Sequence, residues 1–141
     1  MNMKIGVKSL VMVFMCAVIM VVAPLAAEAT RVVELDEDTI FRAGDQEYTF
    51  DKEWAATLYD DGTIKSGHLK YPIQIHFDSY SGYFSAYFKG YIEFYPEGQV
   101  RCGGLAEDAY LPNDKGGMDK YRVGPDKIIF FNKDGKVTGY Y

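Results

Sequence analysis

Apolar and polar residues alternate strictly in two neighbouring stretches near the middle of the chain. Between positions 71 and 78, Ile73, Ile75 and Phe77 share one parity and polar residues take the other. Between positions 83 and 88, two phenylalanines and an alanine share one face, and two tyrosines and a serine share the other. A period of two is typical of a strand with one buried face. The pattern predicts two half-buried strands, with phenylalanine facing the core and tyrosine facing outward.

Turn signals separate these stretches from others like them. After Ala29 no long stretch has apolar residues at helical spacing. The clearest turns are Asp61-Gly62, Pro96-Glu97-Gly98 and Asp134-Gly135, and the last of these predicts a type I′ hairpin because glycine adopts positive φ without strain. Leu111 to Gly117 is rich in turn residues and predicts an inserted surface loop. The sequence therefore predicts an all-β domain, an antiparallel meander of repeated β-hairpins.

The three turns recur at a nearly constant spacing, with their glycines 36 and then 37 residues apart. In each copy an apolar residue, three variable residues, a glycine, any residue and a β-branched residue follow one another. The segment Ile92 to Arg101 resembles the MORN-variant repeat, Tyr59 to Gly67 resembles a second copy, and Phe131 to Gly139 a weaker third. The resemblance implies a meandering or elongated antiparallel sheet used for binding or scaffolding, and it carries over no catalytic residues.

The N-terminal residues have the order of a secretory signal peptide. Lys4 and Lys8 precede the apolar run Leu10 to Ala27, and small alanines follow it. We therefore expect residues 1–29 to be a helical signal peptide that is removed, and residues 30–141 to form a single all-β repeat domain. The expected location is outside the cytoplasm, either periplasmic or secreted.

Two other fates of this segment follow from the same residues. The apolar run has 18 residues, the lower limit for a membrane span, so an uncleaved segment would anchor the domain. We expect the domain to contact a membrane only through such an uncleaved segment. A lipid anchor on Cys16 is disfavoured, because Met15 occupies the position where a small residue is needed.

Removal of the segment changes both the charge and the cysteine count. The remaining chain has 13 basic and 19 acidic residues, a net charge of −6, so no basic footprint for nucleic acid is present. Cys102 is left without an internal partner for a disulfide. We expect it to be a buried small side chain, with a thiol that pairs between chains as the alternative.

Residues that could carry chemistry are scattered. His68 and His76 have no partner at zinc-site spacing, although His76 and Asp78 share one strand face and could form a weak metal or acid–base pair. The acidic run 34–38 is interpreted as a solvated edge, with a cation or a basic partner as the alternative. We expect no catalytic residues, metal or cofactor. The alternative is a small hydrolase or metal-dependent enzyme that uses scattered carboxylates and a histidine.

Aromatic residues provide the best candidate site. Tyr83, Tyr87, Tyr91 and Tyr95 share parity along adjacent strand-like stretches, and Trp54 lies in the first repeat. On an outer sheet face they would form a platform for sugar rings or for an extended chain. The sequence thus predicts an exported, non-enzymatic domain that binds a protein or an envelope polymer through a sheet face. In the alternative, tyrosines are ordinary strand residues of a structural subunit that pairs its strand edges with another chain.

Overall fold

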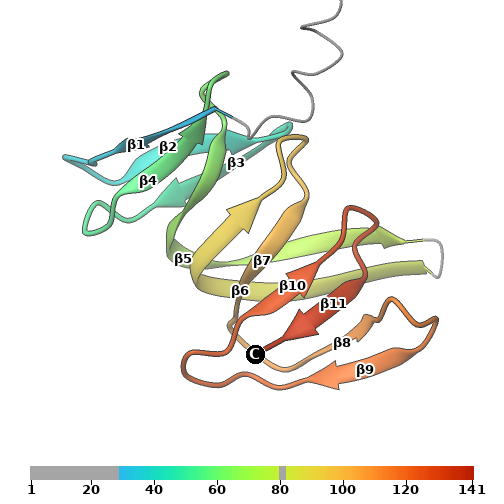
Figure 1. Ribbon diagram of the computed structural model, residues 1–141. Helices are drawn as coiled ribbons and strands as arrows, with labels where there is room; N and C mark the ends of the chain where they lie inside the picture. The colour runs from blue at the N-terminus through green and yellow to red at the C-terminus, as the bar shows by residue number, and fades with distance from the viewer. Residues whose placement is uncertain (1–28, 80–81) are drawn as a thin grey trace, which may run out of the picture.

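The computed structural model describes residues 29–79 and 82–141, apart from the side chains of Asp78 and Ser79, and folds them into strands and turns (Figure 1). The all-β class is therefore confirmed. The predicted signal peptide falls outside the described residues, except for Ala29. Within the described part, no helix has the length and apolar character needed to cross a membrane. The strands are β1 (Thr30–Val33), β2 (Thr39–Ala43), β3 (Gln46–Phe50), β4 (Ala56–Tyr59), β5 (Ile64–Ser79), β6 (Gly82–Phe94), β7 (Val100–Leu105), β8 (Ala109–Pro112), β9 (Met118–Tyr121), β10 (Ile129–Phe131) and β11 (Val137–Tyr140).

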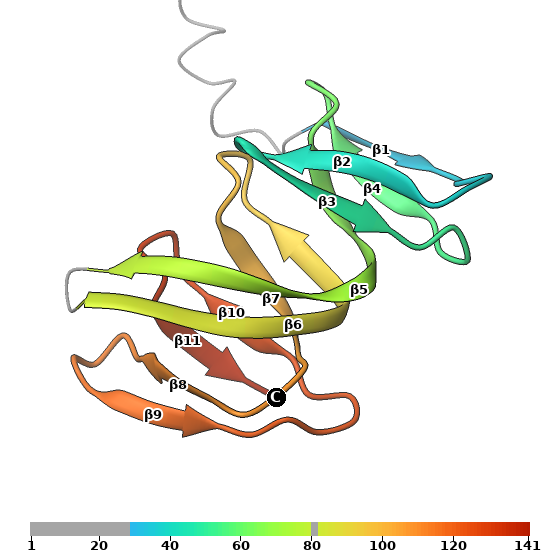
Figure 2. The ribbon, with the colours of Figure 1, turned by 180° about the vertical axis from the view of Figure 1, so that it is seen from behind.

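Most strands of the described region belong to one antiparallel sheet of nine strands. Its order is β1-β4-β5-β6-β7-β10-β11, and the β2–β3 hairpin joins it through the pair Phe50 and Leu69 on β3 and β5 (Figure 2). The strands β8 and β9 form a separate two-stranded sheet. Neighbouring strands in the main sheet are mostly joined by hairpins, so the predicted antiparallel hairpin arrangement is confirmed at this level.

The alternation on β5 and β6 is as predicted. Phe77 and Phe88 are buried, whereas His76 and Tyr83 are exposed. The buried face contributes to a core in which Phe131 lies 4.7 Å from Phe77 and 6.0 Å from Phe88, measured between ring centroids. Aromatic side chains bury large apolar areas, so this phenylalanine cluster supplies much of the packing that holds the sheet in shape.

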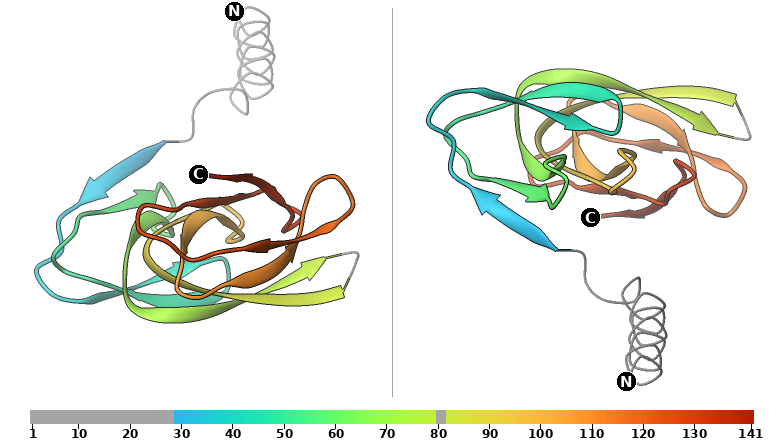
Figure 3. Two further views of the ribbon diagram at one scale, coloured as in Figure 1. Left: turned by 90° about the horizontal axis from the view of Figure 1, so that it is seen from below. Right: turned by 90° about the horizontal axis from the view of Figure 1, so that it is seen from above.

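A bulge bends β5 and β6 near their middles. The β5–β6 register shifts between Leu69 and Ile73, and the β6–β7 register shifts between Lys89 and Ile92. Gly90 lies in this region with φ at 70°, a conformation that other residues adopt with strain. The strand pair consequently changes direction, and its far half passes along the opposite side of the molecule from β10 and β11 (Figure 3).

The three repeated turns share one hydrogen-bonding pattern. The N–H of Tyr59 donates to the carbonyl of Thr63, and the N–H of Gly62 donates to the carbonyl of Tyr59, with equivalent bonds in the turns at 95–99 and 132–136. Positive φ occurs at the glycine of each turn and not at the residue before it. The predicted type I′ turn at Asp134 is therefore wrong. Each turn is a type I turn closed by a left-handed glycine, because both central residues keep a negative φ and the glycine that follows them takes a positive one.

Tyrosine hydroxyls connect consecutive turns. Tyr59 Oη donates to the carbonyl of Phe94 at 2.6 Å, and Tyr95 Oη donates to the carbonyl of Phe131 at 2.7 Å. In Figure 1 the three turns descend in steps along one side of the molecule. The third turn carries Asn132 at the equivalent position, and its Oδ1 accepts two backbone N–H groups of its own turn. We call the two tyrosine bonds the tyrosine ladder.

The segment predicted as a surface loop is partly a strand. Leu111 and Pro112 belong to β8 and are buried, and Leu111 pairs with Asp119 of β9. Residues 113–117 form the connecting turn, in which Asn113 donates its N–H to the carbonyl of Gly117. The prediction of a loop from 111 was wrong because Leu111 packs into the main core, a contact that the local turn residues do not reveal.

Candidate functional site

Two aromatic residues of the predicted platform meet around a histidine. The β5–β6 register places His68 opposite Tyr91, and the turn after β3 carries Trp54 onto the histidine ring. The Trp54 and His68 rings are stacked, 4.0 Å apart and inclined by 8°. The His68 ring meets Tyr91 edge to face at 5.8 Å. We call Trp54, His68 and Tyr91 the aromatic cluster.

Local backbone bonds explain why Trp54 reaches this position. The N–H of Asp51 donates to the carbonyl of His68 at 2.8 Å, which fixes the start of the turn against β5. The Asp51 carboxylate then accepts the N–H of Glu53 at 3.0 Å, a short side-chain turn of the kind aspartate favours. Trp54 remains 53% exposed despite its stacking on His68, so the ring face opposite the histidine is open to solvent.

The protonation state of His68 suits the stack. Burial lowers the pKa of His68 below its ordinary value, and the nearby Asp51 carboxylate opposes that effect in part. The ring is therefore neutral at pH 7. A neutral, flat histidine supports the indole as another aromatic ring would.

A carboxylate lies beside the aromatic cluster. Glu93 accepts a hydrogen bond from Tyr91 Oη at 3.0 Å and forms an ion pair with Arg101 at 3.3 Å. The thiol of Cys102 donates to the same carboxylate at 3.7 Å. Burial, reinforced by the negative charge of Glu93, raises the pKa of Tyr91 to about 12. The hydroxyl of Tyr91 is therefore a stable hydrogen-bond donor over the physiological pH range.

Cys102 has the environment of a structural thiol. It is buried and free, as we expected from the sequence. Burial, reinforced by the negative charge of Glu93, raises the pKa of the Cys102 thiol to about 12. A thiol is nucleophilic as the thiolate, so Cys102 lacks the property that a catalytic cysteine needs.

Tyr91 also borders a groove that Trp54 does not line. The groove has a volume of about 690 Å³ and runs between the bulge at Gly90 and the segment 123–128. Lys89 and Lys127 lie on its walls. The aromatic cluster is therefore continuous with a hollow that contains both apolar surface and charged groups.

The other tyrosines of the predicted platform lie elsewhere. Tyr83 is 70% exposed and stacks on His76 at 5.1 Å, on the far half of the bent strand pair. Tyr87 lies on the same face, near a hydrogen bond from Gln74 to Ser85. The bend at Gly90 separates these residues from Tyr91, so the outer face does not present one flat row.

Tyr95 has a structural position. It follows β6 in the turn, and its hydroxyl belongs to the tyrosine ladder. Lys133 and Arg101 lie over its ring at 5.5 and 5.8 Å from the centroid. The shared parity that grouped Tyr95 with the other tyrosines thus ends where the strand gives way to the turn.

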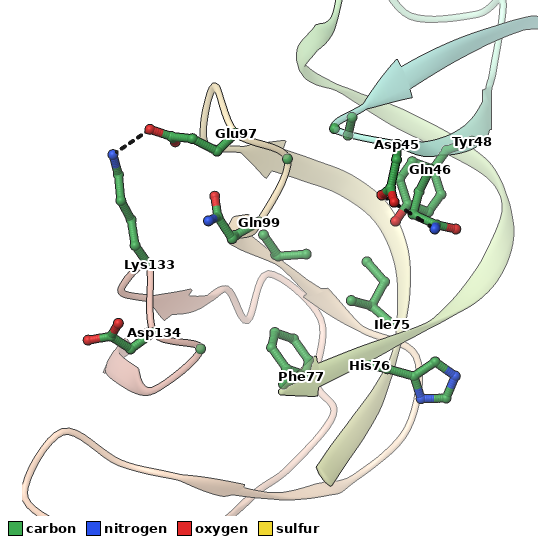
Figure 4. A pocket seen from close by; sticks show the side chains of 15 residues that line it. Asp45, Gln46, Tyr48, Ile75, His76, Phe77, Glu97, Gln99, Lys133 and Asp134 are labelled. Atoms are coloured by element: carbon green, nitrogen blue, oxygen red, sulfur yellow. Dashed lines mark hydrogen bonds and ion pairs between the residues drawn. The ribbon is translucent and has the colours of Figure 1, made fainter. Parts of the chain in front are cut away.

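A second hollow lies on the inner side of β5 (Figure 4). It has a volume of about 400 Å³ and is bounded by the β2–β3 hairpin, the second half of β5, and the turns before β7 and β11. Ile75 and Phe77 point into it, whereas His76 points away. We call it the edge groove.

The acidic candidates are dispersed in the described part of the chain. No group of three or more histidine, cysteine, aspartate or glutamate side chains there could hold a metal ion. Asp38, from the acidic run, accepts the N–H of Lys52 at 3.1 Å and pairs with Lys70 at 3.4 Å. His76 stacks on Tyr83, and the side chain of Asp78 lies outside the described residues.

No protein-family model, curated protein or solved structure matches this chain. The sequence singled out Trp54 and Tyr91 but missed His68, which joins them. Only the cross-strand register brings the histidine between the two rings. The sequence also missed the edge groove, since its walls come from four separate segments.

Proposed function

We propose that residues 30–141 form an exported, non-enzymatic binding domain that holds a glycan polymer of the cell envelope at the aromatic cluster. The observation that carries the proposal is the open face of Trp54, which is supported from beneath by His68 and bordered by Tyr91. Exposed aromatic rings held rigidly in place are favourable contact residues, because little side-chain entropy is lost when a ligand binds.

The neighbouring polar groups favour a sugar as the ligand. The apolar C–H face of a sugar ring matches the electron-rich face of an indole, and its hydroxyls need donors and acceptors at the edge of the stack. Tyr91, Glu93 and Arg101 supply such groups within a hydrogen-bonded set. The adjoining groove gives room for further units of a polymer.

The repeated hairpins and their resemblance to MORN-variant proteins belong to this proposal as predictions. Equivalent register shifts in the β4–β5, β6–β7 and β10–β11 hairpins support the idea of a recurring unit. The tyrosine ladder supports it further, since it joins equivalent positions of consecutive turns. A scaffold of this kind would hold the aromatic cluster on a fixed surface.

Retention on envelope material tests the proposal. Purified residues 30–141 are mixed with insoluble envelope material from which protein has been stripped by protease and detergent. We expect the double variant Trp54→Ala/Tyr91→Ser to bind about tenfold more weakly or worse, since truncating a central aromatic contact costs about 2 kcal/mol. The matched control is Tyr110→Ser, which removes a more exposed tyrosine from the β8–β9 sheet.

The outcomes separate the candidate functions. Unchanged retention of the double variant, with an unaltered circular dichroism spectrum, would eliminate the aromatic cluster as the binding site. Retention on untreated material that disappears after protease treatment would identify a protein partner instead of a glycan. Release of soluble sugars from the stripped material would point to the enzymatic alternative.

A further inference from the structure

One edge of β5 has no neighbouring strand over its second half. The strand pairs with β6 from Ser66 to Leu69 and again from Ile73 to Ser79, but on its other side the pairs with β4 and β3 end at Leu69. Between Ile73 and Phe77 no described strand occupies that side. Pro72 precedes this stretch, as is usual for an edge strand, because proline cannot donate to a second neighbour. An unprotected edge of this kind is a template for strand addition.

The hydrogen-bonding direction of this edge follows from β6. The carbonyl of Tyr87 accepts the N–H of Ala106 on the β7 side, so the backbone polar groups of Tyr87 point away from β5. Gln74 pairs with Tyr87, and this is therefore a pair without hydrogen bonds between β5 and β6. The N–H and C=O groups of Gln74, and by alternation those of His76, consequently point to the open edge.

The edge groove lies on the inner side of the same stretch. Ile75 and Phe77 face it from β5, and Tyr48 and Val100 add apolar surface from the other walls (Figure 4). A strand placed on the edge would send every second side chain toward this surface, because side chains alternate along a strand. Residues of valine or isoleucine size at those positions would fill a hollow of about 400 Å³.

The charges around the groove define the ligand further. Asp45, Glu97 and Asp134 line it, and Lys133 is the basic side chain among its lining residues. Lys133 is engaged by Glu97 at 3.0 Å, so the charge left over is negative. We propose that this edge binds an extended segment of another protein by strand addition, with alternating apolar side chains in the groove and a basic residue beside its acidic rim.

A second copy of this chain fits less well as the occupant. In a symmetric pair formed edge to edge, the acidic rims of both copies would lie close to the same junction, and like charges disfavour such a contact. A basic segment meets the rim with opposite charge. The site differs from the aromatic cluster, so its test is independent of the proposed glycan site.

Gln74→Pro is the decisive variant. It removes the N–H that points to the open edge and leaves the β5–β6 ladder intact, since that N–H does not bond to β6. The matched control is Gln74→Val, which loses the same side-chain hydrogen bond to Ser85 but keeps the N–H. The ligand used is a fluorescein-labelled peptide of alternating valine and threonine with a lysine at each end.

We expect the peptide to bind the wild-type domain and Gln74→Val alike in fluorescence anisotropy, and to bind Gln74→Pro about tenfold more weakly. With glutamate in place of lysine, or with methylated central backbone nitrogens, the peptide should bind the wild type about tenfold more weakly or worse. The two modified peptides keep the test valid if Gln74→Pro fails to fold.

Three results would overturn the proposal. The first is binding of the methylated peptide as tight as that of the parent, since strand addition needs those N–H groups. The second is equal binding of the lysine and glutamate peptides. The third is sedimentation of the wild type as a dimer that Gln74→Pro converts to a monomer, because a second copy would then occupy the edge. Trp54→Ala/Tyr91→Ser should bind the peptide normally, so failure of one proposal leaves the other intact.

Discussion

Replacing Tyr95 with phenylalanine isolates a single hydroxyl of the tyrosine ladder. The hydroxyl donates to the carbonyl of Phe131 at 2.7 Å, and no other change accompanies its removal. The ring stays in place, together with its contacts to Lys133 and Arg101. The variant therefore tests whether the bond between consecutive turns stabilises the fold.

The expected cost follows from the environment of the acceptor. Phe131 is 2% exposed, so its carbonyl has little access to water when the tyrosine hydroxyl is lost. A hydrogen bond contributes a net of about 1 kcal/mol, and leaving a buried acceptor unsatisfied adds to that. We expect Tyr95→Phe to lower the free energy of unfolding by about 1 to 2 kcal/mol. With a urea m-value of about 1.5 kcal/mol/M, the midpoint should fall by roughly 1 M.

Equilibrium unfolding in urea, followed by circular dichroism, measures the effect. Tyr110→Phe is the matched control, because Tyr110 is 65% exposed and its hydroxyl reaches no described acceptor. The control should change the free energy of unfolding by less than about 0.5 kcal/mol. If the two variants unfold at the same urea concentration, the ladder bond contributes nothing and the reasoning is refuted.

Two further outcomes can be measured on the same domain. Gly98→Ala should lower the free energy of unfolding in urea by about 3 kcal/mol or more, because φ is 102° and a Cβ would lie 2.5 Å from the nitrogen of Gly44. Gly62→Ala is the matched comparison. It has open space around the new Cβ and should lower the free energy of unfolding by about 1 kcal/mol. Equal losses would contradict the steric argument. The pKa of His68 is lowered in the fold, so the stability it contributes is present above its unfolded pKa of about 6.5 and is lost as the pH falls through the folded value. Lowering the pH from 7 to 5 should therefore reduce the free energy of unfolding of the wild type more than that of His68→Phe. Parallel pH dependences for the two proteins would exclude this role for the histidine.

The sequence was sufficient to predict the sheet faces but not the turn geometry. Alternation alone assigned Phe77 and Phe88 to the core, because burial on one face imposes a period of two. The turn glycines were located correctly as well. The type of turn was not, since an Asp-Gly pair occurs in both type I′ turns and type I turns closed by glycine. The choice depends on the φ of Asp134, which the rest of the hairpin decides.

The candidate site was predictable only in part, for reasons of register. Trp54 and Tyr91 stood out as aromatic residues with no obvious core position. Their meeting depends on the irregular pairing between Leu69 and Ile73, which sets His68 opposite Tyr91. Bulge positions are poorly encoded in local residue patterns. Tyr95 was grouped with the platform because parity along the sequence does not indicate where a strand ends.

The tyrosine ladder fixes consecutive turns relative to one another although the chain between them folds differently. The first interval is filled by the long excursion of β5 and β6, and the second includes the separate β8–β9 hairpin. The ladder constrains only the position at which each turn arrives, since Tyr59 and Tyr95 each need one carbonyl of the following turn. Asn132 takes the tyrosine's place in the third turn, and its Oδ1 accepts two N–H groups of that same turn. The ladder thus holds the turns against one another in space and leaves the segments between them free to differ, and one of these segments, β5, carries the open edge.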